Sequence, residues 1–182
     1  MMQEGFIREK RELKLLILYI AARLSYPVSF ETMQEMVMSD AAVDFFEFSE
    51  CMNYLTDSGH LSCSSRDLYT ITEKGLENGR ACEDEIPYSV RLRTAELARE
   101  CNDRIRHSIQ VQTSIAPRPN GTRSVTLRLN TEQGTAIWRT DLLVPDESQA
   151  RDLMRRFDAN PQKLYSRVIK ALFGDEPLKE SS

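Results

Sequence analysis

The chain has 182 residues, of which 41% are apolar and 29% charged, with a net charge of −4 at pH 7 and an isoelectric point near 5.4. This composition is that of an ordinary soluble globular protein with one domain or two small ones. The acidic balance gives no overall electrostatic support for a nucleic-acid partner.

The first helix is expected at residues 6–24. Its first half alternates acidic and basic side chains and should be exposed, whereas its second half is nearly all apolar and should be buried. The apolar run at residues 15–22 is too short to span a membrane and has charged residues on both sides. We therefore predict a buried helix, which Pro27 stops from continuing, and no membrane partner.

Two further helices follow the first. Val28 begins a short strand, and Ser29 is a suitable N-cap for a helix over residues 30–38. The third helix is expected at residues 44–57, where Asp44 is the N-cap and the glutamate three residues later completes a capping box.

The third helix has two different faces when its residues are placed at intervals of about 100°. One face is apolar and is expected to pack in the core: Phe45, Phe48, Cys51, Met52 and Leu55. The opposite face is acidic and aromatic: Phe46, Glu47, Glu50, Asn53, Tyr54 and Asp57. The helix contains no Lys or Arg, and its carboxylates oppose binding to a phosphate backbone.

A hairpin and a fourth helix complete the N-terminal pattern. Residues 60–63 and 68–71 are expected to form two strands joined by the polar loop 64–67. Thr72 is the predicted N-cap of a helix that reaches about Cys82.

These segments resemble a known fold. The stretches Gly59-His60-Leu61 and Leu68-Tyr69-Thr70-Ile71-Thr72-Glu73-Lys74-Gly75 look like the wing of winged helix-turn-helix transcriptional regulators. Gly5-Phe6-Ile7-Arg8-Glu9-Lys10 and Phe45-Phe46-Glu47-Phe48-Ser49-Glu50-Cys51 further resemble a bacterial family of unknown function that is grouped with winged-helix proteins. The resemblance implies a winged-helix fold and a regulatory role, and it assigns no catalytic or binding residue.

A long helix is expected from Tyr88 to Arg106, with Pro87 in its first turn. Its apolar residues form one stripe with arginines on either side: Val90, Leu97, Ala98, Cys101 and Ile105. This stripe either packs on the helix's own domain or forms a dimer interface. A third interpretation places the flanking arginines on DNA.

The last third of the chain predicts a three-stranded antiparallel sheet that two helices cover on one face. Three segments alternate apolar and polar residues with a period of two: Ile109 to Ile115, Val125 to Leu129 and Ala136 to Val144. The helices are expected at residues 147–157 and 161–173. The chain is thus expected to be α+β, with a winged helix at 1–84, a connecting helix at 85–106, a β3α2 domain at 107–174 and a frayed tail at 175–182.

The sequence contains no recognisable catalytic or metal-binding pattern. Its cysteines are scattered and have no histidine at ligand spacing, so we expect reduced thiols of a cytoplasmic protein rather than a zinc site: Cys51, Cys63, Cys82 and Cys101. His60, at the foot of the hairpin, is expected to make a structural hydrogen bond. Because phosphate-binding glycine loops and hydrolase motifs are also missing, we predict a non-enzymatic protein without cofactors.

Two kinds of partner remain open. The candidate DNA contacts are Arg8, Arg11, Lys14, Asn53, Arg66 and Lys74. The candidate protein contacts are Phe46, Glu50 and Tyr54 on the third helix, and Val90, Leu97, Cys101 and Ile105 for a homodimer. We expect a dimeric winged-helix transcriptional regulator. The alternative is a winged-helix protein-interaction module that does not bind DNA.

Overall fold

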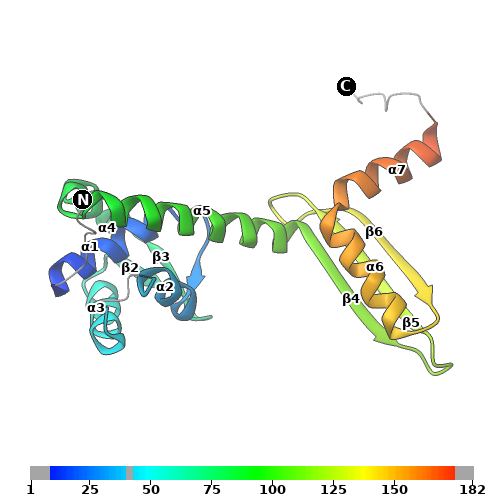
Figure 1. The fold of residues 1–182 in the computed structure, drawn as a ribbon, viewed down its shortest axis with the longest axis horizontal. Coiled ribbons are helices and arrows are strands. Elements are labelled where there is room, and N and C mark those ends of the chain that lie inside the picture. The colour runs from blue at the N-terminus through cyan, green and yellow to red at the C-terminus, as the bar shows by residue number, and fades with distance from the viewer. Residues whose placement is uncertain (1–8, 40–42, 175–182) are drawn as a thin grey trace. The chain divides into compact units, whose positions relative to one another are not determined.

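The computed structural model describes residues 9–39 and 43–174, and it is a mixed α+β protein (Figure 1). These residues form seven α-helices and two three-stranded antiparallel sheets. The predicted α+β class is therefore confirmed. The chain divides into two compact units, Met1–Arg104 and Ile105–Ser182. The candidate DNA contact Arg8 and the predicted frayed tail at 175–182 lie outside the described residues.

Helix α1 (Lys10–Ala21) lies at the centre of the N-terminal unit. Leu13 and every residue from Leu16 to Ala21 are buried, which confirms that the second half of this helix belongs to the core. The helix ends before Leu24, its predicted last residue. The backbone N–H groups of Arg23 and Leu24 bond to carbonyls only three residues earlier, and this tighter turn leads the chain out of the helix.

Three more helices of this unit pack against α1: α2 (Phe30–Val37), α3 (Phe45–Asp57) and α4 (Glu73–Ala81). A side chain fixes the start of each one. Ser29, Asp44 and Thr72 accept hydrogen bonds from backbone N–H groups in the first turn of the helix that follows, at 3.2, 2.8 and 3.1 Å. These contacts confirm the three N-caps predicted from the sequence.

The N-terminal unit also holds an antiparallel sheet in the order β1-β3-β2, made of β1 (Val28–Ser29), β2 (Leu61–Cys63) and β3 (Leu68–Ile71). Tyr69 of the central strand pairs with Val28 on one side and with Cys63 on the other. The turn between β2 and β3 holds Asp67 in the left-handed region at φ 55°. The predicted hairpin is therefore confirmed.

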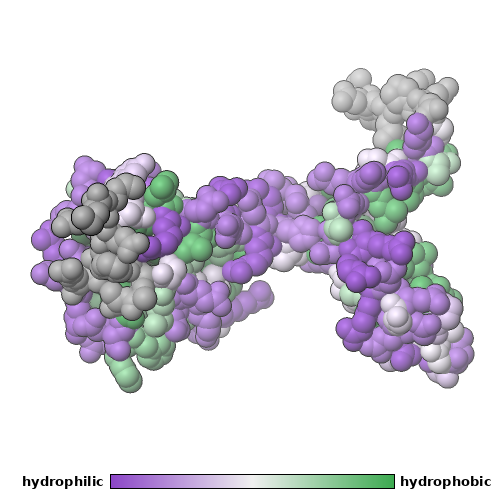
Figure 2. Space-filling view, viewed as in Figure 1, coloured by the Kyte–Doolittle hydropathy of each residue, from purple (hydrophilic) through white to green (hydrophobic). Residues whose placement is uncertain are grey.

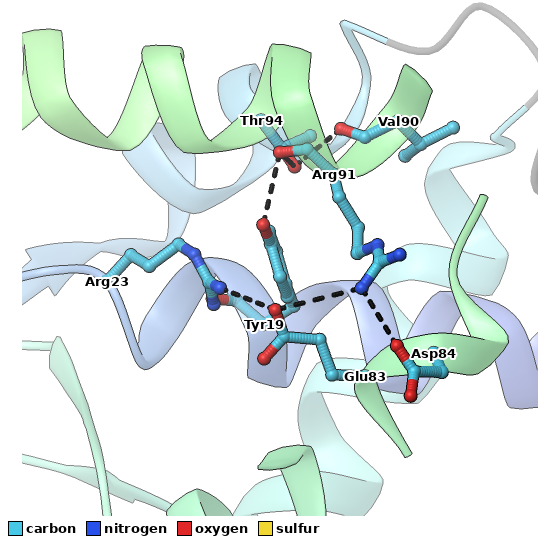
Figure 3. Close-up of polar contacts among 7 residues, drawn as sticks. All are labelled: Tyr19, Arg23, Glu83, Asp84, Val90, Arg91 and Thr94. Atoms are coloured by element: carbon cyan, nitrogen blue, oxygen red, sulfur yellow. Dashed lines mark hydrogen bonds and ion pairs between the residues drawn. The ribbon is translucent and has the colours of Figure 1, made fainter. Parts of the chain in front are cut away.

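A short 3-10 helix, η1 (Glu83–Glu85), leads into the long helix α5 (Tyr88–Gln110) and is tied to α1 (Figure 3). The guanidinium of Arg23 lies over the ring of Tyr19, 3.3 Å from its centroid. The same guanidinium pairs with the carboxylate of Glu83 at 2.8 Å. The end of α1 and the start of η1 are thus held together by one arginine.

The same network reaches α5. The hydroxyl of Tyr19 donates to the backbone carbonyl of Arg91 at 3.2 Å, and the guanidinium of Arg91 pairs with Asp84 at 3.2 Å (Figure 3). Farther along α5, the side-chain amide of Asn102 donates to the carbonyl of Arg23 at 2.8 Å. The contacts at Arg91, in the first turn of α5, and at Asn102, three turns later, therefore hold α5 against the end of α1.

The apolar stripe of α5 is buried within the N-terminal unit. Val90 and Ala98 are fully buried, and Cys101 is 3% exposed. The interpretation that the stripe packs on its own domain is thus confirmed for these residues. Assigning Val90 and Cys101 to a dimer interface is corrected, because their side chains already lie in the core. Leu97 and Ile105 are half-buried, and self-association of the chain stays a prediction.

The C-terminal unit is an antiparallel sheet in the order β4-β5-β6 followed by two helices: β4 (Val111–Pro117), β5 (Arg123–Asn130), β6 (Ala136–Val144), α6 (Glu147–Ala159) and α7 (Pro161–Phe173). Helix α6 lies along one face of the sheet (Figure 1). Its Phe157 packs with Val125, Leu127 and Leu129 of the central strand, and all four are buried. The three predicted strands and two predicted helices are confirmed as elements.

Two details of this unit differ from the prediction. Ile109 belongs to α5 rather than to the first strand, because the amide of buried Asn130 donates to the carbonyl of Ile109 at 2.8 Å and holds the end of the helix. Helix α7 has no buried residue, and only Leu164 and Tyr165 near its start pack against the core. The expectation that both helices cover the sheet therefore holds for α6 and for the start of α7.

His60 joins the end of α3, the start of β2 and helix α4. Its Nδ1 lies 2.8 Å from the hydroxyl of Ser58, and its Nε2 lies 2.6 Å from the amide nitrogen of Asn78. Only the neutral ring can accept a hydrogen bond from that amide. Burial lowers the pKa of His60, and the positive charge of Lys74 lowers it further. The predicted structural role of His60 is confirmed.

The backbone of His60 also limits what can stand at Gly75. A Cβ at Gly75 would lie 2.2 Å from the backbone carbonyl oxygen of His60, which accepts a hydrogen bond from the backbone N–H of Thr72 at 3.0 Å. We predict that Gly75→Ala lowers the free energy of unfolding by roughly 2–3 kcal/mol. Gly79 of the same helix is the matched control. A Cβ there would meet Leu18 at 3.4 Å, so Gly79→Ala should be neutral or stabilise the protein by up to about 1 kcal/mol. Urea unfolding measures both changes, and equal effects at the two glycines would contradict a steric clash at Gly75.

The lowered pKa of His60 predicts a pH dependence of stability. Below about pH 6.5 the unfolded chain binds a proton at this histidine more readily than the folded chain does. The free energy of unfolding should therefore fall as the pH is lowered from about 6.5 toward the folded-state pKa, and the contribution of His60 should be complete above about pH 7. Urea unfolding of the native chain and of His60→Gln at several pH values isolates this contribution. The prediction fails if both proteins lose stability equally on acidification.

Candidate functional site on the outer face of helix α3

The outer side of α3 is exposed to solvent in the described part of the chain. We call it the α3 face, and all of its residues are exposed: Phe46, Glu47, Glu50, Asn53, Tyr54 and Asp57. Phe46 is 75% exposed and Tyr54 is 55% exposed. Figure 2 shows pale green, apolar atoms next to purple, hydrophilic ones at the lower edge of the N-terminal unit, where Figure 1 places α3. The predicted assignment of these six residues to the outside is confirmed.

Phe45 is predicted in the core, and the structure corrects this. It is 43% exposed, and its ring lies between those of Phe30 and Phe46 with centroid distances of 6.3 and 5.8 Å. The reason is its place in the first turn of α3, where the fully buried Phe48 takes the core position against Phe30 at 5.0 Å. Phe45 therefore adds a third aromatic ring beside the α3 face.

Two lysines of α1 bind to the α3 face. The ammonium of Lys10 pairs with the carboxylate of Glu50 at 2.5 Å, and the ammonium of Lys14 lies 4.2 Å from the ring centroid of Tyr54. The hydrogen bond and the charge of Glu50 raise the pKa of Lys10. Exposed pairs of this kind add little to stability. They do, however, hold the ammonium groups of Lys10 and Lys14 against α3 residues.

The other predicted DNA contacts do not form a continuous basic surface. The guanidinium of Arg11 pairs with Glu85 of η1 at 2.7 Å, and the ammonium of Lys74 donates to the carbonyl at the C-cap of α3 at 2.7 Å. Asn53 and Arg66 are exposed on α3 and on the β2–β3 turn. Of the five candidates in the described part of the chain, three are therefore engaged in contacts within the N-terminal unit.

The charge of the N-terminal unit has the same sign as the α3 face. Residues 1–104 contain 12 Lys and Arg against 19 Asp and Glu. A surface with this balance repels phosphate and attracts a basic partner.

The contacts of Lys10 and Lys14 with α3 were not predicted, although the spacing of these residues in the sequence indicates them. Lys10 and Lys14 are four residues apart on α1, and their partners Glu50 and Tyr54 are four residues apart on α3. Residues at this spacing lie on one side of a helix. The two pairs of residues therefore meet along the line where the two helices pack.

No metal centre or membrane span is found within residues 9–39 and 43–174. In this part of the chain no three His, Cys, Asp or Glu side chains are grouped to hold a metal ion. None of its helices combines the length and the apolar character needed to cross a membrane. The four cysteines are free thiols, and burial raises the pKa of Cys51.

A protein-family profile described as a domain of unknown function (DUF4364) matches residues 13–172, and the chain belongs to this family. The match covers both units of the structure. No curated protein and no solved structure matches the chain.

Proposed function

We propose that the chain is a non-enzymatic regulatory protein whose N-terminal unit is a winged helix that binds a protein partner through the α3 face. Three helices followed by a β2–β3 hairpin, with β1 as the third strand of the small sheet, support the winged-helix assignment. In DNA-binding proteins with a helix-turn-helix, the helix at the place of α3 is the one that enters the major groove.

The observation that carries the proposal is the chemistry of the α3 face. It exposes the rings of Phe46 and Tyr54 among three carboxylates, and α3 contains no Lys or Arg. Aromatic side chains are enriched at protein interfaces and dominate their binding energy. The carboxylates around these rings favour a partner with a basic surface and would oppose the phosphates of DNA.

A DNA-binding transcriptional regulator is the second candidate. It is favoured by the exposed Asn53 on α3, because an amide can bind adenine through two hydrogen bonds. The exposed Arg66 on the β2–β3 turn adds one positive charge to the same unit. Two such groups are few for a protein that must also neutralise several phosphates, so we place this function second.

Photo-crosslinking in the cells that express the chain tests the first proposal. A benzoylphenylalanine at position 46 should give discrete protein adducts. Reversing the charge of the face with Glu47→Lys and Glu50→Lys should reduce the adducts more than about fivefold, because the partner surface is basic. The same probe at Tyr88, which is 70% exposed on the same unit, should give no such adducts.

Stability serves as the control for this experiment. Because Phe46 is exposed, Phe46→Ser should change the free energy of unfolding by less than about 0.5 kcal/mol while it weakens the partner contact by more than about 1 kcal/mol. The proposal is contradicted if position 46 gives adducts with nucleic acid, if it gives no adducts, or if charge reversal leaves the protein adducts unchanged.

A further inference from the structure

The C-terminal unit has a groove between α6 and α7, which diverge from the connection at Asn160 (Figure 1). Its volume is about 480 Å³, within the usual range for a small-molecule site. Its walls are formed by Leu153, Arg156, Phe157, Ala159, Asn160, Lys163, Leu164 and Arg167. Half of these residues are apolar and three are cationic, and none is acidic.

The apolar wall of the groove is part of the unit's core. Phe157 is fully buried, and Leu153 and Leu164 pack against the core cluster around it. A hydrocarbon group in the groove would therefore contact side chains that are already held in place, so little ordering would be needed on binding.

The cations of the groove differ from the other cations of α6. Arg151 pairs with Glu147 and Arg155 pairs with Asp152, each at 2.5 Å. By contrast, within residues 9–39 and 43–174 no ion pair or hydrogen bond is found for the side chains of Lys163 and Arg167. These two residues are one helical turn apart on α7 and both reach the groove.

Arg156 and the start of α7 add to this positive potential. Asp152 binds Arg156 through Nε at 2.7 Å, and Arg156 also lines the groove. Helix α7 begins with Pro161, and the side chain of its N-cap Asn160 makes no capping hydrogen bond. The free N–H groups and the helix dipole at such an end favour an anion. Residues 105–174 as a whole contain 11 Lys and Arg against six Asp and Glu.

We propose that this groove binds a small organic anion with an apolar body. Its carboxylate, phosphate or sulfonate group would lie beside Lys163 and Arg167, and its hydrocarbon part would lie on Leu153, Phe157 and Leu164. The positive charges of Lys163 and Arg167 favour an anionic ligand, because an anion would pair with two cations that have no other partner among the described residues. This assigns a ligand site to the C-terminal unit and does not depend on the α3 face.

Fluorescence titration of the full chain with anilinonaphthalene sulfonate, which joins a sulfonate to an apolar ring system, tests the proposal. The native chain should bind it saturably. The double variant Lys163→Gln, Arg167→Gln should bind it about tenfold more weakly, because it loses the two cations that would pair with the sulfonate. Lys170→Gln, which removes one charge from the same helix outside the groove, should keep the native affinity within about twofold. Lys163→Arg should also keep it, because the charge is conserved.

A second probe separates anion recognition from simple apolar binding. N-phenylnaphthylamine has the same rings without the sulfonate, and the double variant should bind it as the native chain does. Thermal melts should show that all variants stay folded. The proposal is overturned if the double variant keeps the native affinity for the sulfonate probe, if Lys170→Gln weakens binding as strongly, or if duplex DNA rather than the small anion requires Lys163 and Arg167.

Discussion

Burial of α1 is the constraint on which the N-terminal unit depends. A helix that is apolar all round its second half must be covered on every side. The chain covers it with α2, α3, α4, β3 and η1, and α5 bonds to its Tyr19. Each fully buried Leu or Ile of this helix contributes about 1.5–3 kcal/mol. The polar contacts of Tyr19 and Arg23 then fix where α5 crosses it. The positions of the other helices follow from this arrangement.

The same constraint creates the α3 face. Because Phe48, Met52 and Leu55 place one side of α3 in the core, the opposite side of the helix is left exposed. The charged first half of α1 brings Lys10 and Lys14 against that side, and they become partners of α3 residues rather than contacts for a phosphate backbone. The acidic residues of the N-terminal unit and the cations of the α6–α7 groove suit two different ligands, a basic protein and an organic anion.

The sequence predicted features that depend on neighbouring residues, such as helix N-caps. It did not predict which residues distant in the sequence pack against each other. The caps at Ser29, Asp44 and Thr72 depend on residues within three positions, so the sequence alone located them. The stripe of α5 indicated that Val90 must be buried but not against which surface. Ile109 joined a helix because of Asn130, 21 residues away. Phe45 has the right angular position for the core, but it stands one turn too early along α3 to reach it.

We propose that α3 presents a protein-binding surface and is not a DNA-reading helix. Fluorescence anisotropy with random duplex DNA over a salt series tests this most directly, since phosphate contacts make affinity fall steeply with salt. We predict binding weaker than about 1 μM at about 150 mM salt, and no effect of Asn53→Ala. Submicromolar binding that Asn53→Ala weakens would contradict the claim, because α3 would then be in contact with the bases.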